Sequence, residues 1–248
     1  MPKFFVTQDK ISDNQIIIDS EDVTHISRVL RLEKGDNVTV CDGQGTDYDA
    51  QIDTIEPKKI LLNIVSRQKS ETEPNIKVTL FQALPKASKM EYIIQKTTEL
   101  GISEIVPVKL SRCVVKIDNK KDEKKKIDRW QKIAESAAKQ SGRGYVPEVT
   151  NFISFEECLG ELKECDESFM CYEKGGVSLS KTGIAPVSEG EEKTIGLFIG
   201  CEGGFESHEA ESCSQAGVTV VSLGPRILRC ETAPLAALSV IMSLTGNM

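Results

Sequence analysis

Two stretches near the C-terminus have the form of a buried strand that stops abruptly in a glycine-containing loop. They are residues 194–205 (TIGLFIGCEGGF) and residues 223–233 (LGPRILRCETA), the second directly after the apolar run 218–223. An apolar run predicts a buried strand, and the glycines predict an open backbone beyond it. Because open α/β sheets bind ligands at the carboxyl ends of their strands, the two loops predict one ligand crevice.

The acidic residues of these loops indicate the charge of the ligand. Glu202 lies in the first loop and Glu231 in the second. A phosphate site needs exposed backbone N–H groups and no nearby anion. The loops therefore favour a cofactor with cationic character over a nucleotide phosphate.

The N-terminal quarter of the chain is rich in short strand candidates. Turn signals separate the later ones, which favours a small β-barrel. The expected strands are residues 3–7, 15–18, 37–41, 48–55 and 59–65.

One helix is expected within this barrel region, over residues 20–32. Its apolar side chains recur at helical spacing, at Val23, Ile26, Val29 and Leu30. A row of basic side chains, His25, Arg28 and Arg31, lies on the other side. This row could contact RNA phosphates, or it could be a solvated helix face with a structural histidine.

Residues 67–75 are polar, lack periodicity and carry a proline, so they are the best linker candidate. We therefore expect domains over residues 1–71 and 72–248. Beyond the linker, strands and helices alternate, which predicts an α/β fold with a parallel sheet. The expected strands are 76–84, 104–108, 168–172, 195–199 and 218–223, and the expected helices are 88–100, 124–140, a short one near Ser154, 207–216 and 232–244.

Charge is unevenly distributed along the chain. The formal net charge is −7, but residues 109–143 contain twelve Lys and Arg against five Asp and Glu, giving +7 and leaving −14 elsewhere. A local basic field on an acidic body can hold a phosphate backbone and still resist nonspecific association. A solvated loop and helix face is the alternative interpretation.

Cysteine usage argues against disulfides and against a metal site. The eight cysteines are scattered, no Cys-x-x-Cys occurs, and the chain has two histidines. Buried thiols in a reducing compartment are expected. No apolar run has membrane-spanning length and the N-terminal apolar part is too short for a signal peptide, so a cytoplasmic protein without membrane association is expected.

The loops and several further segments resemble the RsmE family, which methylates N3 of a uridine in 16S ribosomal RNA of the small ribosomal subunit. The matching segments occur in family order and span nearly the whole chain. They are HISRVLR (25–31), QALPK (82–86), KMEYIIQKTTELG (89–101), RWQKI (129–133), SGR (141–143), IGCEGGF (199–205) and LGPRILRCETA (223–233).

The resemblance implies a SPOUT-type α/β methyltransferase domain with a C-terminal trefoil knot, preceded by a small PUA-like β-barrel that binds RNA. It also implies S-adenosylmethionine as cofactor, ribosomal RNA or the small subunit as partner, and a homodimer with each site completed near the interface. Two residues depart from the family pattern. Cys201 stands where proline is usual, and Cys230 where threonine is usual. Loss of a proline frees φ and adds an N–H, so weaker preorganisation of this loop is expected.

The resemblance and the loop chemistry together suggest the site residues. The expected cofactor-binding residues are Phe198, Ile199, Gly200, Glu202, Gly203, Leu223, Gly224, Ile227, Leu228, Thr232 and Ala233. The expected RNA-binding residues are His25, Arg28, Arg31, Lys86, Lys124, Lys125, Lys126 and Arg143. No metal is needed, because methyl transfer is an in-line displacement in which the protein positions reactants and stabilises charge.

Methylation of uracil N3 requires loss of its proton. Glu231 is one candidate base, and Arg229 or Arg226 could stabilise negative charge on a carbonyl oxygen. Alternatively, Glu202 and Glu231 could pair with these arginines or cap the helices that follow.

The sequence also bears on three other functions. An NAD-type oxidoreductase is disfavoured, because no Gly-x-Gly-x-x-Gly follows the first strand of the α/β part. A noncatalytic ribosome-binding module would need no paired strand-end loops. A related methyltransferase for transfer RNA or another ribosomal site is compatible with the same fold.

Overall fold

The computed structural model describes residues 3–115, 119–188 and 191–248. They form two compact units, one comprising Met1–Glu73 with Ala138–Val146 and the other Pro74–Ala137 with Pro147–Met248. The expected division was 1–71 and 72–248. The structure differs in that residues 138–146 belong with the N-terminal unit, because Gly142 O accepts from Lys3 Nζ at 3.1 Å and Arg143 pairs with Glu73 at 2.6 Å.

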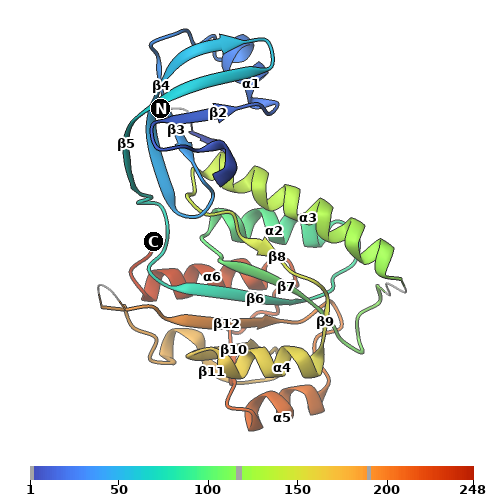
Figure 1. The fold of residues 1–248 in the computed structure, drawn as a ribbon. Helices are drawn as coiled ribbons and strands as arrows, with labels where there is room; N and C mark the ends of the chain where they lie inside the picture. The colour runs from blue at the N-terminus through green and yellow to red at the C-terminus, as the bar shows by residue number, and fades with distance from the viewer. Residues whose placement is uncertain (1–2, 116–118, 189–190) are drawn as a thin grey trace. The chain divides into compact units, whose positions relative to one another are not determined.

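The first unit is built on a five-stranded sheet (Figure 1). Its strand order is β1-β3-β4-β5-β2, with β1 and β3 parallel and the other neighbours antiparallel. The bounds are β1 Lys3–Phe5, β2 Gln15–Ile18, β3 Asn37–Cys41, β4 Thr46–Glu56 and β5 Lys59–Lys69, with a 3-10 turn η1 at Gln8–Lys10. Alternating buried aliphatic side chains from these strands, including Ile16, Val38 and Leu62, form the core. All five strands expected from the sequence are confirmed.

The helix of this unit is shorter than expected. α1, Asp22–Thr24, continues as a π-helix, η2, over His25–Val29, in which Leu30 N donates to His25 O at 2.9 Å. A π-turn has more residues than an α-turn, so it changes which side chains face the core. Val23 and Ile26 are buried as expected, whereas Val29 is 64% exposed, and the prediction of Val29 as a core residue was wrong.

The second unit contains an eight-stranded parallel sheet. The strand order is β11-β13-β10-β12-β6-β7-β8, and β9 also pairs with β7. The bounds are β6 Lys77–Ala83, β7 Glu104–Lys109, β8 Glu148–Val149, β9 Ile153–Ser154, β10 Glu167–Cys171, β11 Val177–Ser178, β12 Thr194–Ile199 and β13 Thr219–Ser222. The predicted parallel α/β arrangement is confirmed, and β8, β9 and β11 are additional short strands.

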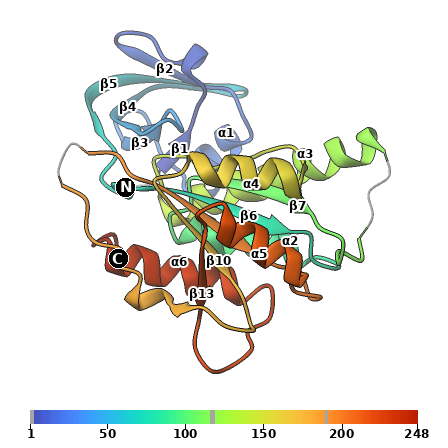
Figure 2. The same ribbon diagram turned by 90° about the horizontal axis from the view of Figure 1, so that it is seen from below.

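Helices cover both faces of this sheet (Figures 1 and 2). α4 lies on one face, where Phe155 stacks on Phe198 of β12 at 6.3 Å. α2 and α6 pack together on the other face, where α6 contacts β12. The helix bounds are α2 Lys89–Glu99, α3 Lys120–Ser141, α4 Phe155–Glu164, α5 Ser207–Gln215 and α6 Ala233–Leu244, with a 3-10 turn η3 at Leu179–Lys181.

Local sequence signals set several of these boundaries. Ser154 Oγ accepts from Glu157 N at 3.2 Å, and Glu157 Oε2 accepts from Ser154 N at 2.7 Å. This capping box starts α4 as the sequence predicted. Over the described ranges, none of the helices has the length and hydropathy needed to cross a bilayer.

Candidate active site

A pocket lies at the carboxyl ends of β10, β12 and β13, closed by the loop that leads into α6. Its unfilled volume is about 660 Å³ with the open solvent at its mouth included. We call it the strand-end pocket. It is lined by Cys171, Tyr172, Glu173, Ile199, Gly200, Cys201, Gly204, Phe205, Ser222, Leu223, Gly224, Pro225, Arg226, Ile227, Leu228, Cys230 and Ala233.

Close packing explains the glycine at position 200. A Cβ there would lie 3.1 Å from the Phe205 ring and 3.4 Å from Gly204 Cα. The Phe205 ring is buried against Phe198, with the ring centroids 4.8 Å apart. Gly224 has a different requirement, since its φ is +112° and a Cβ would meet nothing within 4 Å.

Arg112 holds the far side of the glycine loop. Its Nε and Nη2 donate to Glu206 Oε1 and Oε2 at 2.7 and 2.9 Å, and its Nη1 donates to Gly203 O at 2.8 Å. This paired hydrogen bonding lowers the pKa of the Glu206 carboxyl. The loop after β12 is therefore anchored by a side chain from the segment that follows β7.

Lys89, at the start of α2, joins the two loops seen in the sequence. Its Nζ lies 2.9 Å from Glu202 Oε1 and 3.1 Å from Glu231 Oε2. Glu202 also accepts from Lys86 N at 3.1 Å. The structure thus corrects the pairing considered above, because the two carboxylates pair with Lys89 and not with Arg226 or Arg229.

This ion cluster shifts the pKa values of its members. The hydrogen bond to Glu202 has the largest effect on Lys89 and the hydrogen bond to Glu231 the next largest, and both raise the pKa of the Lys89 ammonium. Burial acts to raise the pKa of Glu231, but its backbone hydrogen bond, the Cys230 thiol and Lys89 outweigh burial and lower it. Glu202 follows the same pattern: burial acts to raise its pKa, but Lys89 together with the backbone N–H groups of Glu202 and Lys86 outweighs burial and lowers it. Both carboxylates are therefore ionised at neutral pH.

The structure brings most of the expected cofactor residues to the strand-end pocket. Those that line it are Ile199, Gly200, Leu223, Gly224, Ile227, Leu228 and Ala233. The remaining four lie outside its lining. Phe198 is buried beneath it, Glu202 belongs to the Lys89 cluster, Gly203 contacts Arg112, and Thr232 precedes α6.

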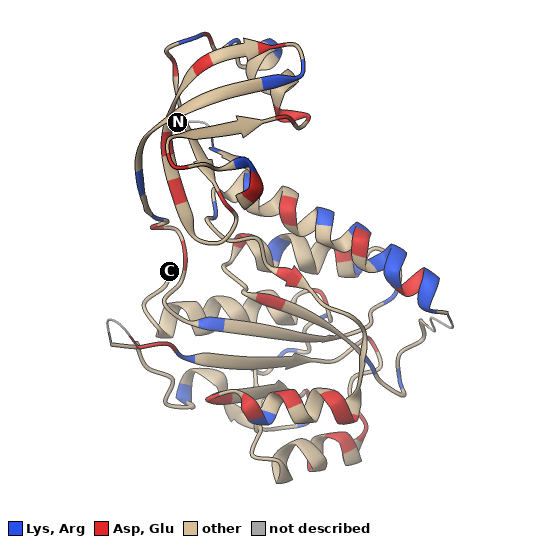
Figure 3. Cartoon of the chain, viewed as in Figure 1, with Lys and Arg blue, Asp and Glu red and all other residues tan. Residues whose placement is uncertain are grey.

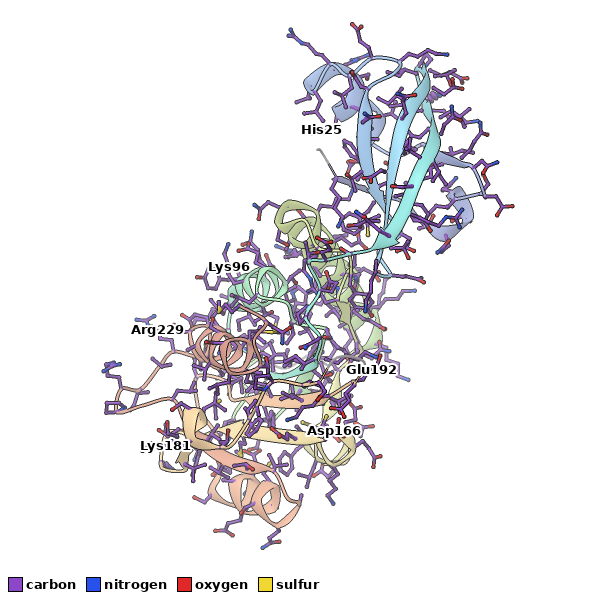
Figure 4. The ribbon with its side chains drawn as sticks, turned by 90° about the vertical axis from the view of Figure 1, so that its left-hand side faces the viewer. His25, Lys96, Asp166, Lys181, Glu192 and Arg229 are labelled. Atoms are coloured by element: carbon purple, nitrogen blue, oxygen red, sulfur yellow. The ribbon has the colours of Figure 1, made fainter. Side chains whose placement is uncertain are left out.

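The three expected catalytic residues lie in different surroundings. Arg226 lines the pocket and is exposed. Arg229 is exposed in the loop before α6, outside the pocket lining (Figure 4). Glu231 is tied to Lys89, and its oxygen lies 3.3 Å from Cys230 Sγ. Arg226 is thus the expected catalytic residue that the geometry places at the pocket itself.

Several residues of the site were not predicted from the sequence. Cys171 is the last residue of a third strand, β10, and Tyr172 and Glu173 directly follow it, where the apolar run also stops in a loop with Gly175 and Gly176. This run carried the same signal as the two loops that were recognised. Lys89 and Arg112 carried no comparable signal, because their partners are remote in sequence.

The expected RNA-binding residues of the first unit differ in exposure. His25, Arg28 and Arg31 are exposed, but Arg31 lies beyond η2 with φ +53°, so the three do not form a row on one regular helix. Arg143 is 4% exposed and its Nη2 lies 2.6 Å from Glu73 Oε2. The prediction that Arg143 contacts RNA is corrected, because its guanidinium is buried in an ion pair.

The basic residues of the second unit are accessible. Lys86, Lys124 and Lys125 are exposed, while Lys126 is half-buried with its Nζ 5.9 Å from the centre of the Trp130 ring. Lysines gather on the first turns of α3, whereas Asp and Glu predominate on α4 and α5 (Figure 3). Within the basic segment expected from the sequence, the start of α3 is therefore a lysine-rich helical surface.

The strand-end pocket fits the cofactor implied by the family resemblance. Apolar walls from Ile199, Phe205 and Leu228 suit an adenine ring, and the Glu173 carboxylate suits a cationic group. Within the described part of the chain, no three His, Cys, Asp or Glu side chains are arranged to hold a metal ion. The residues present thus provide for S-adenosylmethionine as a bound organic cation.

Comparison with known families assigns both units. An RNA methyltransferase domain family matches residues 72–242, and an RNA methyltransferase PUA domain family matches residues 18–65. A curated relative, ribosomal RNA small subunit methyltransferase E of Bacillus subtilis strain 168, is 36% identical over 97% of this chain and 96% of its own.

Solved structures share the whole fold. A ribosomal RNA small subunit methyltransferase E from Neisseria gonorrhoeae, bound to S-adenosyl methionine, superposes with a TM-score of 0.84 at 31% identity and covers 98% of each chain. The methyltransferase Lpg2936 from Legionella pneumophila, also in complex with this cofactor, has a TM-score of 0.83 at 30% identity, covering 98% of this chain and 97% of that one.

Proposed function

The chain belongs to the family of ribosomal RNA small subunit methyltransferase E, and we propose from this premise that it methylates N3 of a specific uridine in 16S ribosomal RNA, using S-adenosylmethionine. The observation that carries this proposal is the strand-end pocket, formed by the same loops whose sequences resemble the family. The fold is a PUA-like unit followed by an α/β methyltransferase unit.

The pocket residues position the reactants. S-adenosylmethionine, when bound, supplies an electrophilic methyl group on a cationic sulfur. The chain presents apolar walls to adenine and backbone groups of residues 198–203 and 223–228 to the adenine and ribose, where glycine permits close approach. Lys89 and Arg112 fix these loops before the substrate arrives, which limits the reorganisation needed for reaction.

The residues around the loop before α6 act on the uracil. Arg226 lines the pocket, and Arg229 is exposed in the same loop. Both stabilise the negative charge that the ring gains as N3 loses its proton. Glu231 is the candidate acceptor for that proton. The lowered pKa of Glu231 keeps its carboxylate ionised at neutral pH but makes it a weak base. We therefore expect a rate acceleration at the low end of the range that general bases provide.

RNA is held by basic residues of both units, each acting on the phosphate backbone. Lys86 and the lysines at the start of α3 supply the contacts from the methyltransferase unit, and His25, Arg28 and Arg31 supply those from the PUA-like unit. Asp and Glu predominate on α4 and α5 (Figure 3), and these carboxylates repel RNA phosphates. Binding of RNA to these two helices is therefore disfavoured.

We further propose that two copies pack through their methyltransferase units. Leu235, Ala236 and Val240 of α6 stay half-buried within one chain, and Ile227 is 84% exposed in the loop before α6. A second copy would cover this apolar surface. Static light scattering at micromolar concentration tests the dimer, and a monomeric mass would contradict it.

Two finer features of the proposal rest on the family resemblance. The first is a trefoil knot threaded by the C-terminal segment, supported by the return of α6 to β12 and α2 after β13 has paired with β10. The second is a cytoplasmic location, supported by eight free thiols, which persist in reducing compartments.

Mass spectrometry of ribosomal RNA from a strain that lacks this protein tests the activity and its substrate. The expected result is loss of one N3-methyluridine from 16S ribosomal RNA, restored by the wild-type gene. Loss of a different modification would assign another RNA site. An unchanged RNA, together with no binding of S-adenosylhomocysteine in calorimetry, would favour a noncatalytic ribosome-binding module.

A further inference from the structure

A carboxamide is buried at the carboxyl end of β6, against the glycine loop (residues 200–205) that follows β12. It belongs to Gln82, which is 0% exposed, on a strand that lies between β7 and β12. Its Nε2 donates to Ala83 O at 2.9 Å and to Gly200 O at 3.3 Å. One side chain therefore binds the backbone of its own strand and the backbone of the glycine loop.

These two contacts mark the place where β6 and β12 stop pairing. The last paired residues are Gln82 and Ile199, so Ala83 and Gly200 are the next positions on the two strands. In a continued parallel ladder, backbone N–H groups would satisfy the carbonyls there. Gln82 Nε2 supplies both hydrogens instead, so the glycine loop can leave β6 while both carbonyls keep a donor.

The partners of this carboxamide fix its orientation. If it were turned over, Oε1 would face two carbonyl oxygens, and an oxygen of this kind cannot donate to either. In the observed orientation Oε1 is buried, and no donor among the described residues lies within hydrogen-bond distance of it. A buried acceptor without a donor lowers the stability of the fold. This cost favours a side chain that is retained for the contacts of its Nε2.

Gly200 is the pocket residue that Gln82 holds. It lines the strand-end pocket, and the Phe205 ring, 3.1 Å from where a Cβ would lie, leaves no room for a side chain at this position. A glycine has no side chain to fix its position and its backbone is unusually free. Its carbonyl group is then the means by which a neighbour can restrain it. A second contact from the same strand end supports the loop, since Lys86 N donates to Glu202 Oε1 at 3.1 Å.

We propose that Gln82 is a positioning residue for the cofactor, whose carboxamide acts through Gly200 O to set the conformation of the glycine loop and thereby the affinity of the strand-end pocket for S-adenosylmethionine. Gln82 lies outside the pocket lining, so its effect passes through the loop. A loop that is already held in its binding conformation loses less entropy when the cofactor binds, and affinity is higher for that reason. The inference rests on the function proposed above.

Calorimetry with S-adenosylhomocysteine and hydrogen-exchange mass spectrometry, both on the full-length protein, test this role. Gln82→Met keeps the length of the side chain but cannot donate to Gly200 O. We expect affinity to fall about tenfold. Amide exchange should become faster in peptides that cover residues 200–205, because the loop opens more often. Peptides that cover the other pocket loop, residues 223–228, should exchange as in the wild type.

The matched control is Gln131 of α3, whose carboxamide also makes two hydrogen bonds to the backbone. Its Nε2 donates to Pro147 O at 3.2 Å, and its Oε1 accepts from Val149 N at 2.9 Å. Gln131→Met should lower the melting temperature, because it loses both bonds. It should leave S-adenosylhomocysteine affinity and the exchange of residues 200–205 unchanged.

Gln82→Glu adds a readout that depends on the donor itself. An ionised carboxylate presents only acceptors to the two carbonyls, whereas a protonated carboxyl group can donate to Gly200 O. Burial favours the protonated form, so affinity relative to wild type should be lowest near about pH 8 and should recover toward about pH 5.5. If Gln82→Met does not fold, Gln82→Asn, which draws the carboxamide one methylene back from Gly200 O, should give the same local change.

Four results would overturn the proposal. They are wild-type affinity in folded Gln82→Met, wild-type exchange over residues 200–205, faster exchange spread evenly over the second unit, and a Gln82→Glu affinity that does not recover on acidification. Exchange of the glycine loop is measured without ligand. A wild-type protein that does not bind S-adenosylhomocysteine would therefore count against the proposed function, while faster exchange of the loop in Gln82→Met would still show that Gln82 positions it.

Discussion

Lys89 Nζ lies 3.1 Å from Glu231 Oε2, and this contact joins α2 to the loop that precedes α6. The same ammonium also contacts Glu202 in the loop that follows β12. One cation therefore sets the spacing of two loops that contribute walls or neighbours to the strand-end pocket. The side chains are partly exposed, so their value lies in positioning more than in global stability.

The first prediction concerns Lys89. Lys89→Met keeps the length of the side chain but leaves Glu202 and Glu231 facing each other without a cation. We expect affinity for S-adenosylhomocysteine to fall about tenfold in calorimetry, whereas the melting temperature should fall only slightly because the ion pairs are partly exposed.

The matched control is Lys96→Met on the same helix, where Lys96 pairs with Glu99 one turn away at 2.7 Å. It should leave cofactor affinity unchanged. Lys89→Arg should restore part of the lost affinity because it keeps the charge but changes the geometry. Equal effects of the two methionine substitutions would mean that Lys89 does not position the loops.

The first prediction extends to pH, because the same ion cluster contains a carboxyl with a lowered pKa. The folded-state pKa of Glu231 is lowered from 4.5, so its stabilisation is fully present above the unfolded value and is lost as pH falls through the folded value. The melting temperature difference between wild type and Glu231→Gln should therefore be constant at neutral pH and shrink below about pH 4.5. A difference that grows on acidification would contradict the lowered pKa.

How well the sequence predicted the structure depended on the distance between interacting residues. The strands β6, β7, β10, β12 and β13 were expected because each is a compact apolar run, and the Ser154–Glu157 capping box is local. Strands of two residues, such as β8, have no such run. The π-turn at η2 was missed because periodicity alone assumes a regular α-helix, and this misassigned Val29.

The residues of the candidate site also differ in whether a local sequence pattern could reveal them. The loops at Gly200 and Gly224 were recognised because their residues are contiguous, and both line the pocket. The role of Lys89 depends on carboxylates far along the chain, so no local pattern could reveal it. Arg143 was assigned to RNA because it is basic, whereas its partner Glu73 is close only in the folded unit.

A second prediction separates the requirements of two glycines. Gly200→Ala should weaken S-adenosylhomocysteine binding, since its Cβ would meet the Phe205 ring at 3.1 Å. Gly224→Ala should weaken binding through backbone strain of about 1–3 kcal/mol at φ +112°. Gly160→Ala in α4, where a Cβ meets nothing within 4 Å, is the control and should preserve affinity and slightly stabilise the helix. If all three bind alike, the loops do not form the cofactor site.

A third prediction concerns the lysines at the start of α3. Replacing Lys124, Lys125 and Lys126 by glutamate should weaken binding to a 16S ribosomal RNA fragment and flatten the dependence of log affinity on log salt. Affinity for S-adenosylhomocysteine should stay unchanged.

The control for this triple variant reverses Lys163 in α4, Lys181 in η3 and Lys193 just before β12, which changes the net charge equally away from α3. It should alter the salt slope much less. Equal slopes for the two variants would show that net charge, and not the surface of α3, governs RNA binding.

A fourth prediction assigns Arg226 and Arg229. If they stabilise the uracil as it loses its proton, alanine at either position should lower the single-turnover rate far more than it lowers cofactor affinity, because the interaction strengthens in the transition state. Lysine should rescue only in part, since it lacks the planar fork. Because Arg226 lines the pocket and Arg229 does not, Arg226→Ala should also cause the larger loss of cofactor affinity. An equal loss of single-turnover rate and cofactor affinity would mean that both arginines contribute only to binding in the ground state.

The last prediction tests Glu231 as the base. Glu231→Gln keeps the shape of the side chain but cannot accept the N3 proton. We expect the single-turnover rate at saturating cofactor to fall about 100-fold and to lose its acidic limb, which in wild type should lie below the usual glutamate range because the pKa of Glu231 is lowered. Glu202→Gln, which removes the other carboxylate of the Lys89 cluster, is the matched control and should retain the limb. If Glu231→Gln lowers the melting temperature while its single-turnover rate and pH profile match those of wild type, Glu231 is a structural partner of Lys89 and the proton must leave to water or RNA.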